Sequence, residues 1–512
     1  RKGNRQPTMD ACPGRLILSF VLAAAGAISA ESKSDECIEI SLQQAVLLSL
    51  RNNLDIRIAS LAPDIADDSV LQQVSTFDSV LTSSVAGGKA EQQTGTQLAG
   101  AEVISTDRFD AAIGIRKRYE TGTVVSTDLT TRREGTNSFF SSFDSSNAAN
   151  AAVTVSQPLL KGRGTEVNLA AIQVARNTRQ QSLHEFRRTV EIVVGQTEKA
   201  YWNLVFAQAN LRVQQALLDQ AKSLLEHVND LKAGGILTAT DVIQARAGVA
   251  SREENIIVAD QALRNAEDVL KEITSMLSDD SKRDSALTAT TIAKISQLEV
   301  REESALQNAF KNRPEYQAAR LDLQSRNLAV VVARNARYPK LDLQGTFALN
   351  GLTGSYGNTV DSLVSTDFYE WNVGLTLELP RGFRSARSTY RRRQNEKAQT
   401  LLRMKQLEQQ ILREVRLSTR QVRATQKRIQ TTEAARDLQK EKLAGEEDRL
   451  KDGQSTPQEV LDFQVDFAVA ELNNERSKLD YQKAIVDLEV AQGTLLETRL
   501  IEIVDNQILG SE

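Results

Sequence analysis

The sequence has very little of what most catalytic sites are built from. Among its 512 residues there are two histidines, His184 and His227, and two cysteines. The histidines lie in a segment of helical composition, and no His/Cys spacing typical of a zinc site occurs. No nucleophile, base or ligand set can be recognised either. The sequence therefore predicts no enzyme, no metal site and no cofactor.

Charge of one sign and long apolar runs are also scarce. Lys plus Arg total 63 and Asp plus Glu total 67, which gives a net charge of −4. This balance lacks the basic excess of nucleic-acid-binding proteins, so no nucleic-acid partner is expected. After residue 30, no stretch has the roughly 18 consecutive apolar residues of a membrane-spanning helix. Aromatic residues make up only 5%, which is typical of extended helices rather than of a compact enzyme core.

The N-terminal segment predicts export. Residues 16–30 read LILSFVLAAAGAISA and are preceded by Arg15. A basic residue, an apolar run too short to span a bilayer and small residues before the cut are typical of a signal peptide, here ending near Ala30. A short buried helix is the alternative. If Cys12 leaves with the signal peptide, Cys37 remains as a single thiol and no intrachain disulfide is expected.

The chain repeats itself in two registers. Residues 45–59 and 305–319 both contain a helical run, a polar Asn break and a second helical run, at an offset of 260. Apolar residues also recur every seven positions within 204–277, and at an offset of 218 eight of the ten equivalent positions stay apolar. A seven-residue spacing of apolar residues, with small residues between them, is typical of closely packed coiled-coil seams. The sequence therefore predicts a tandem duplication whose first copy has 42 extra residues (260 minus 218), within about 89–150.

Each copy is expected to contain a first helix, strands, a long helix, a tight turn with glycine and a returning helix. The long helices would each reach about 100 Å at 1.5 Å per residue. They are expected at 166–232 and 384–451, with returning helices at 241–278 and 459–497. Alternation of apolar and polar residues restricts the strands to the segments between these helices, at 77–87, 153–156, 341–349 and 371–379.

These strands have the length of tilted membrane strands, nine or ten residues in the clearest cases. The edge of a soluble sandwich is the alternative. About four strands per chain cannot close a barrel, and open edges are not tolerated in lipid. If the strands span a membrane, several chains must therefore share one barrel. Residues 107–118 and 122–132 form a third hairpin candidate, which we interpret as an extracellular extension, with additional barrel strands as the alternative.

Three motifs resemble those of the TolC-like outer-membrane efflux proteins. Residues 312–315 (NRPE) are similar to the start of a helix in the family's second repeat, and residues 156–160 (SQPLL) to its strand-to-helix junction. Residues 235–245 (GILTATDVIQA) are similar to its periplasmic hairpin tip. The similarity runs from about 40 to 497 in the family's order. The 42-residue excess and Pro457 at the second tip depart from the family pattern.

The resemblance implies an α+β membrane protein with a tandem-duplicated protomer. Its antiparallel coiled-coil hairpins would form an α-barrel through the periplasm, and about four strands per chain would join a shared trimeric β-barrel of twelve strands. The implied partners are a homotrimer, outer-membrane lipid, a periplasmic adaptor protein and an inner-membrane transporter. The implied function is a passive exit duct for efflux or secretion. An exported coiled-coil protein, such as a periplasmic spacer or an adhesin stalk, is the alternative, but it does not explain the alternating strands.

The expected organisation follows the chain. It starts with the signal peptide (1–30) and equatorial helices at the N-terminus (31–76). The remaining segments are the strands with their extracellular insertion (77–160), the first helical hairpin (161–278), an equatorial segment with the first helix of the second repeat (279–337), the second strand pair (338–380), the second hairpin (381–497) and a tail (498–512).

By the same resemblance, side chains near the two tips line the periplasmic mouth. The 218 register pairs Asp241 with Glu459, and Asp462 lies three residues further on the same helix face. Carboxylate rings favour cations, whereas a helix N-cap is the alternative role for Asp241. The entrance is expected at Thr240, Asp241, Glu459 and Asp462. Adaptor contacts, with a solvated turn as the alternative, are expected at Gly235, Ile236, Leu237, Thr238, Gly453, Gln454 and Ser455.

Overall fold

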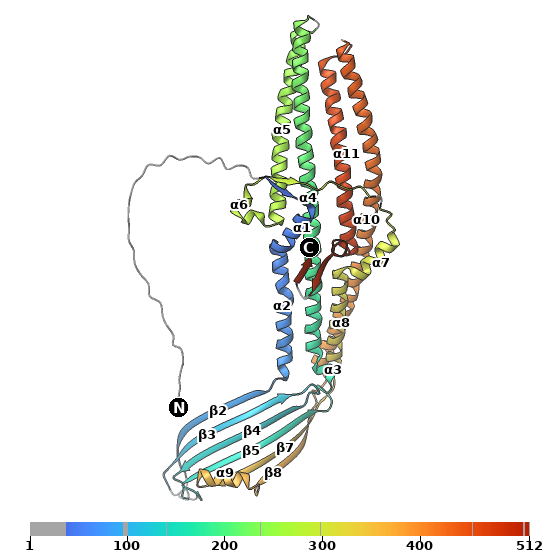
Figure 1. Cartoon of the computed structure of the whole chain (residues 1–512). Helices are drawn as coiled ribbons and strands as arrows, with labels where there is room; N and C mark the ends of the chain where they lie inside the picture. Colours follow the sequence, from blue (N-terminus) through green and yellow to red (C-terminus); the bar gives the residue numbers. More distant parts are fainter. Residues whose placement is uncertain are drawn as a thin grey trace, which may run out of the picture.

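The molecule is elongated, with a curved antiparallel sheet at one end and long helical hairpins reaching to the other (Figure 1). Short helices and strands surround the long helices in a middle section. This computed structural model describes residues 37–95, 101–139, 141–235, 237–296, 298–452, 454–504 and 507–510. The expected signal peptide lies outside the described residues.

Two long hairpins form the helical end. Helix α4 (Ala170–Ala233) returns as α5 (Ala239–Ile273), and α10 (Arg384–Lys451) returns as α11 (Pro457–Gln492). The outgoing helices have 64 and 68 residues, which corresponds to about 96 and 102 Å. The predicted helices are confirmed, with bounds that differ by five residues or fewer. Within the described residues, no helix combines the length and the apolar composition needed to cross a bilayer.

The predicted duplication is confirmed in the bounds of the elements. At an offset of 260, helices α1 (Leu42–Asn52) and α2 (Leu54–Val74) and strand β2 (Val80–Gln93) recur as α7 (Glu302–Asn312), α8 (Pro314–Asn335) and β7 (Lys340–Thr353). At an offset of 218, helix α5 recurs as α11. The offset therefore changes between Gln93 and Ala170, which places the extra residues of the first copy there.

The sheet has six strands rather than the expected four. Its order is β2-β3-β4-β5-β7-β8, and all neighbours are antiparallel. The remaining strands are β3 (Val103–Arg118), β4 (Val124–Thr136), β5 (Ser145–Pro158) and β8 (Tyr369–Glu378). Helix α9 (Tyr356–Val364) connects β7 to β8 and packs on β7 and β5.

The interpretation of residues 107–132 as an extracellular extension is wrong. Strands β3 and β4 lie between β2 and β5 and pair with them over most of their length. Threonine and alanine occupy many positions that isoleucine or leucine fills in a strongly alternating strand, as at Thr127 and Ala111. The alternation is therefore too weak to distinguish a wall strand from a loop extension.

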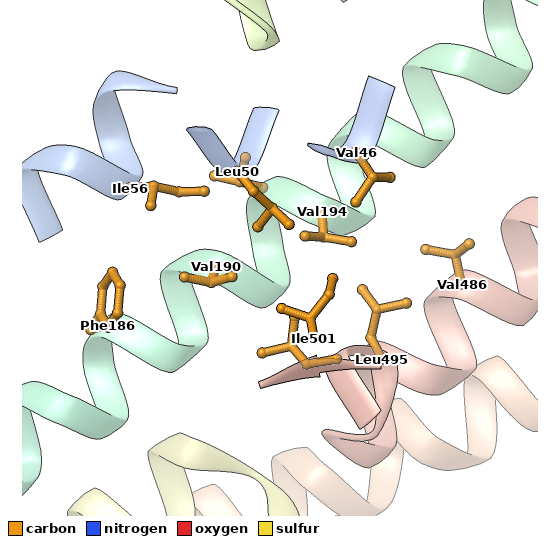
Figure 2. Packing of buried hydrophobic residues seen from close by; sticks show 11 residues of the cluster. Val46, Leu50, Ile56, Phe186, Val190, Val194, Val486, Leu495 and Ile501 are labelled. Carbon is orange, nitrogen blue, oxygen red and sulfur yellow. The ribbon is translucent and has the colours of Figure 1, made fainter. Parts of the chain in front are cut away.

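The middle section is built around the long helices. Strand β1 (Ile38–Ile40) pairs in parallel with β6 (Leu287–Ala289), and β9 (Ile501–Val504) pairs with β10 (Gln507–Gly510). Short elements complete it: η1 (Ser75–Phe77), α3 (Thr165–Asn168), η3 (Met276–Ser278), α6 (Asp280–Arg283) and α12 (Leu495–Thr498). Figure 2 shows how Val46, Phe186, Val486 and Leu495 from four different helices meet in one apolar core. Both ends of the described chain are thereby held to the long helices.

Candidate entrance and docking site at the hairpin tips

The two tips pack against each other through an apolar tip cluster. Val242 and Val460, which are equivalent under the 218 offset, are both buried in it. The other members of the tip cluster are Ala221, Leu224, Val228, Ala245, Leu450 and Leu461. Asp241 and Glu459 each directly precede one of these valines in the sequence. The cluster therefore fixes the backbone position of both carboxylate-bearing residues.

The first tip turns through Gly234 and Gly235. The Gly235 amide donates to the Lys232 carbonyl at 3.0 Å, and Gly235 takes a φ of +78°, which favours glycine. Leu237 is half-buried against the tip cluster. Gly235, Thr238 and Thr240 are exposed, whereas Ile236 lies outside the described residues.

Asp241 belongs to the cap of its own helix. Its Oδ2 accepts hydrogen bonds from the backbone N–H and the hydroxyl of Thr238, both at 2.7 Å. These bonds hold the pKa of Asp241 below its usual range. Thr238 is the N-cap residue, and Asp241 is the third helical residue that reaches back to it. The carboxylate is therefore ionised and held in place.

The second tip repeats this arrangement. Glu459 Oε2 accepts from the hydroxyl of Ser455 at 2.8 Å and from the N–H of Thr456 at 3.2 Å. These hydrogen bonds lower the pKa of Glu459. The Thr456 hydroxyl in turn accepts from the N–H of Glu459 at 3.3 Å, which completes a capping box.

Further hydrogen bonds stiffen the second turn. The single hydroxyl hydrogen of Ser455 is shared between Glu459 and Glu446, which is buried on α10. Arg449 donates to Glu446 at 3.0 Å and to the carbonyl of Gln454 at 3.3 Å. Gln454 is exposed and Ser455 half-buried, and Gly453 lies outside the described residues. The predicted tip residue Ser455 therefore has a structural role within the turn, which the sequence alone does not reveal.

Asp462 differs from the two capping carboxylates. It is exposed, and its Oδ1 accepts from Gln458 at 2.9 Å. No hydrogen bond or ion pair joins it to Asp241 or Glu459 among the described residues. The tip packing brings the three carboxylates to the same end of the molecule, but each faces solvent separately.

Two further residues of α5, which the sequence does not single out, also contact α11. Arg252 is buried, and its Nη2 donates to the Leu461 carbonyl at 3.4 Å. Burial lowers the pKa of Arg252, while the neighbouring Asp462 carboxylate opposes this change. A Cβ on Gly248 would lie 2.8 Å from Leu461 Cδ1, so the helices approach closely there. The only sign of this contact in the sequence is that Gly248 lies one helical turn before Arg252 within the coiled-coil repeat of α5.

A groove near the tips runs between α4, α10 and α11. It is lined by charged and apolar side chains that include His227, Glu447 and Lys451. The other histidine, His184, lies half-buried in the middle section, where burial lowers its pKa. In the part of the chain that the structure describes, no group of three or more His, Cys, Asp or Glu side chains could hold a metal ion.

The two long helical hairpins, the antiparallel sheet and the middle section can be compared with one known protein family. The profile of the family named outer membrane efflux protein matches residues 123–275 and 305–494, which is more than half of the chain. The chain belongs to the outer membrane efflux protein family. The match begins at the start of β4, after β2 and β3.

Similar proteins agree with this assignment. Outer membrane protein TolC of Vibrio cholerae serotype O1 is 24% identical over 370 residues, which cover 70% of this chain and 80% of TolC. The Campylobacter jejuni CmeC outer membrane channel has a TM-score of 0.63 at 17% identity, covering 89% of this chain and 86% of CmeC. VceC from Vibrio cholerae has a TM-score of 0.62 at 17% identity, covering 88% of this chain and 96% of VceC.

This efflux protein is therefore an outer-membrane channel that extends into the periplasm. Its family consists of transport ducts rather than enzymes, so the protein serves as an efflux exit duct. The coiled-coil spacer or stalk is thereby set aside as a function.

Proposed function

We propose that the efflux protein works as a homotrimer coupled to a periplasmic adaptor protein and an inner-membrane transporter. The open sheet carries the proposal. Strands β2 and β8 each pair with one neighbour only in the described protomer, and an open sheet edge is not tolerated in lipid. Pairing of β8 with β2 of the next copy removes every edge when the copies form a closed ring. The number three is the one that the resemblance implies.

The two faces of the sheet support a shared barrel in lipid. On the apolar face, Phe347 pairs with Trp371 and Leu343 with Leu375. Trp371, Val373 and Leu375 are 66–68% exposed in the protomer, so they need a surrounding apolar phase. The opposite face is polar: Thr154 and Thr346 share a hydrogen bond of 3.1 Å, and Asn150 donates to Asn350 at 2.7 Å. Such a sheet fits a wall between lipid and water.

The tips would form the entrance and the docking surface. Thr240, Asp241, Glu459 and Asp462 would line the periplasmic mouth, with three carboxylates per chain and about nine in a trimeric ring. The proposed adaptor contacts are Gly235, Ile236, Leu237, Thr238, Gly453, Gln454 and Ser455, of which Gly235, Thr238 and Gln454 are exposed. Exposure and the fixed capping geometry support both roles.

The trimer is tested by fractionation and mass. We expect the mature protein to float with outer-membrane markers, to need detergent for extraction and to give a three-chain mass by native mass spectrometry. Recovery from the soluble periplasm, or a mass of one chain from the membrane, would overturn the proposed trimeric duct.

The entrance is tested by ion selectivity in planar bilayers. Asp462→Lys places about three cations in the trimeric ring without breaking a helix cap, so cation preference should weaken or reverse. Glu447→Lys makes the same charge change in the groove beside the tips and should leave selectivity unchanged. Equal selectivity in Asp462→Lys and the unmodified channel would remove Asp462 from the conducting path.

A further inference from the structure

We propose that the outer-membrane section of the duct is an eighteen-stranded barrel, in which the β3–β4 hairpin of each chain is a wall segment that sets the width of the outlet. The proposal rests on the proposed trimer, because six strands per chain must be multiplied by three. The family resemblance alone implies twelve strands. The difference is the 42-residue excess of the first copy.

The repeat register identifies the added hairpin. Strand β2 corresponds to β7 at an offset of 260, and the β5 end at Pro158 corresponds to the β8 end near Pro380. Between these two matched strands the second copy has a connection through α9, whereas the first copy has β3 and β4. The hairpin therefore has no counterpart in the second copy.

The apolar face of the sheet continues across the added hairpin. Ile113 pairs with Leu129, and Ile115 pairs with Leu81 of β2. One row of paired residues crosses the five strands from β3 to β8 on this face, and its members are Ile113, Leu129, Ala151, Leu349 and Tyr369. In β2 the row ends on Ser83. A hairpin standing in water outside the wall would have no reason to match the lipid-facing rows of its neighbours.

The polar face continues as well. Arg132 donates to Asp110 at 2.5 Å, and Arg108 to Glu134 at 3.1 Å, on the face opposite Ile113 and Leu129. In lipid, such charges would be costly at the depth of a strand centre. Facing a water-filled interior they are solvated, and their pairing neutralises the lining locally. The added hairpin therefore presents water-compatible charges to the interior of the barrel.

The turn of the added hairpin is anchored where the sheet meets the helices. Arg118 donates to Asn168 of α3 at 2.8 Å, and the Gly164 amide donates to the Thr121 carbonyl at 3.2 Å. Gly122 has a φ of +91°, and a Cβ there would lie 2.5 Å from the Gly162 carbonyl oxygen. This close approach fixes the hairpin at the strand-to-helix junction, so it spans the full height of the sheet.

A two-strand addition also preserves closure. Successive strands alternate in direction, so β2 and β8 run oppositely in a six-stranded sheet, as they would in a four-stranded one. The β8 edge of one chain can therefore pair antiparallel with β2 of the next. Because barrel diameter grows roughly linearly with strand number, eighteen strands give about 1.5 times the diameter of twelve. The outlet would then pass solutes of larger cross-section than a twelve-stranded barrel of the same tilt.

Cysteine accessibility in the trimer tests whether the hairpin is part of the wall. On a Cys37→Ser background, Ala112→Cys should react with a water-soluble maleimide in lipid nanodiscs, while Ile113→Cys should be protected at least tenfold. Thr346→Cys and Phe347→Cys on β7 are the matched controls and should give the same contrast. Equal labelling of the two β3 positions beside a normal contrast on β7 would overturn the wider barrel. Loss of the contrast on β7 would overturn the membrane sheet itself.

Deletion of the hairpin tests the width. Removing residues 103–136 joins two loops at the same end of the sheet and leaves β2 beside β5. In projection images of the trimer, the unmodified barrel should be about 1.5 times as wide as the barrel of the deletion variant. Equal widths would overturn the proposal, and if the deletion variant does not assemble, the cysteine contrast decides. A native mass other than three chains would instead contradict the proposed trimer.

Discussion

At the scale of single residues, the buried charges of the middle section determine how the protein responds to pH. The Glu191 side chain on α4 is 4% exposed and lies 3.8 Å from Arg187. Burial raises its pKa to about 7, which the positive charges of Arg187 and Arg313 oppose and the carboxylates of Glu315 and Glu497 reinforce. A glutamate that is ionised in the unfolded chain is therefore partly protonated in the folded one near neutral pH.

Glu191→Gln should flatten the pH dependence of stability. The pKa of Glu191 in the folded protein, about 7, exceeds its ordinary value of 4.5. The stabilisation that Glu191 contributes is therefore fully present below pH 4.5 and is lost as the pH rises through 7. At 1.36 kcal/mol per pKa unit, the loss is at most about 3 kcal/mol. Thermal unfolding in detergent between pH 5 and 8 measures it. The exposed Glu185→Gln on the same helix should keep the unmodified slope, and an equal slope in Glu191→Gln would contradict the assignment.

What the sequence could predict at this scale depends on how local the interaction is. The first hairpin tip is predicted by a short motif and the second by the 218 offset. The alternative role of Asp241 as the helix N-cap is wrong in position, because Thr238 is the N-cap and Asp241 is the third helical residue that reaches back to it. Arg252 and Glu446 were not predicted, because the burial of Arg252 depends on a helix far away in the sequence and that of Glu446 on the geometry of the turn. The lumenal role of Glu459 and Asp462 stays a prediction.

At the scale of elements, a buried ion pair ties the C-terminal segment to the long helices. Arg499, which follows α12, donates to both carboxylate oxygens of Glu198 on α4, at 2.6 and 3.0 Å. Glu198 is 1% exposed, and Glu489 of α11 lies 3.0 Å from the same guanidinium. Helix α4 and the C-terminal part of the chain, 301 residues apart at Glu198 and Arg499, therefore meet at one side chain.

Arg499→Ala should destabilise this junction strongly. It leaves the buried Glu198 carboxylate without its partner, which costs about 3 kcal/mol or more. Proteolysis should cut the C-terminal segment much faster than in the unmodified protein. Arg428→Ala removes an arginine from the more exposed pair with Asp480 and should cost less than about 1 kcal/mol. Similar losses in both variants would mean that the Arg499 bridge contributes no more than a surface pair.

Elements were predictable where one periodicity dominates. The ends of the long helices are predicted to within five residues, because the seven-residue spacing of apolar side chains persists over many turns. Strands β7 and β8 were recognised from strict alternation. Strands β3 and β4 were detected as a hairpin but assigned to the wrong place, since their weak alternation is compatible with a wall or with an extension. Their place follows from pairing with β2 and β5, which no local pattern specifies.

At the scale of the whole molecule, the direction of the sheet decides which loops face outward. Strand β4 ends and β5 begins at the end of the sheet far from the helices, and the turn of residues 119–123 lies at the end near α3. Ser142→Cys on a Cys37→Ser background should therefore react with a membrane-impermeant maleimide on intact cells. Glu120→Cys should react only after the outer membrane is ruptured. The reverse pattern would mean that the molecule is inserted the other way round.

The unequal division of strands between the two copies has a consequence for symmetry. Each chain supplies two helical hairpins of nearly equal length. Three chains would therefore place six similar tips around one axis, in an approximately sixfold arrangement. The sheet takes four strands from the first copy and two from the second, so the barrel of such a trimer would have only a threefold axis in the membrane. A periplasmic ligand that recognises what both tips share would find six binding positions. A molecule that recognises the outer rim, such as an antibody against the 137–144 loop, would find three.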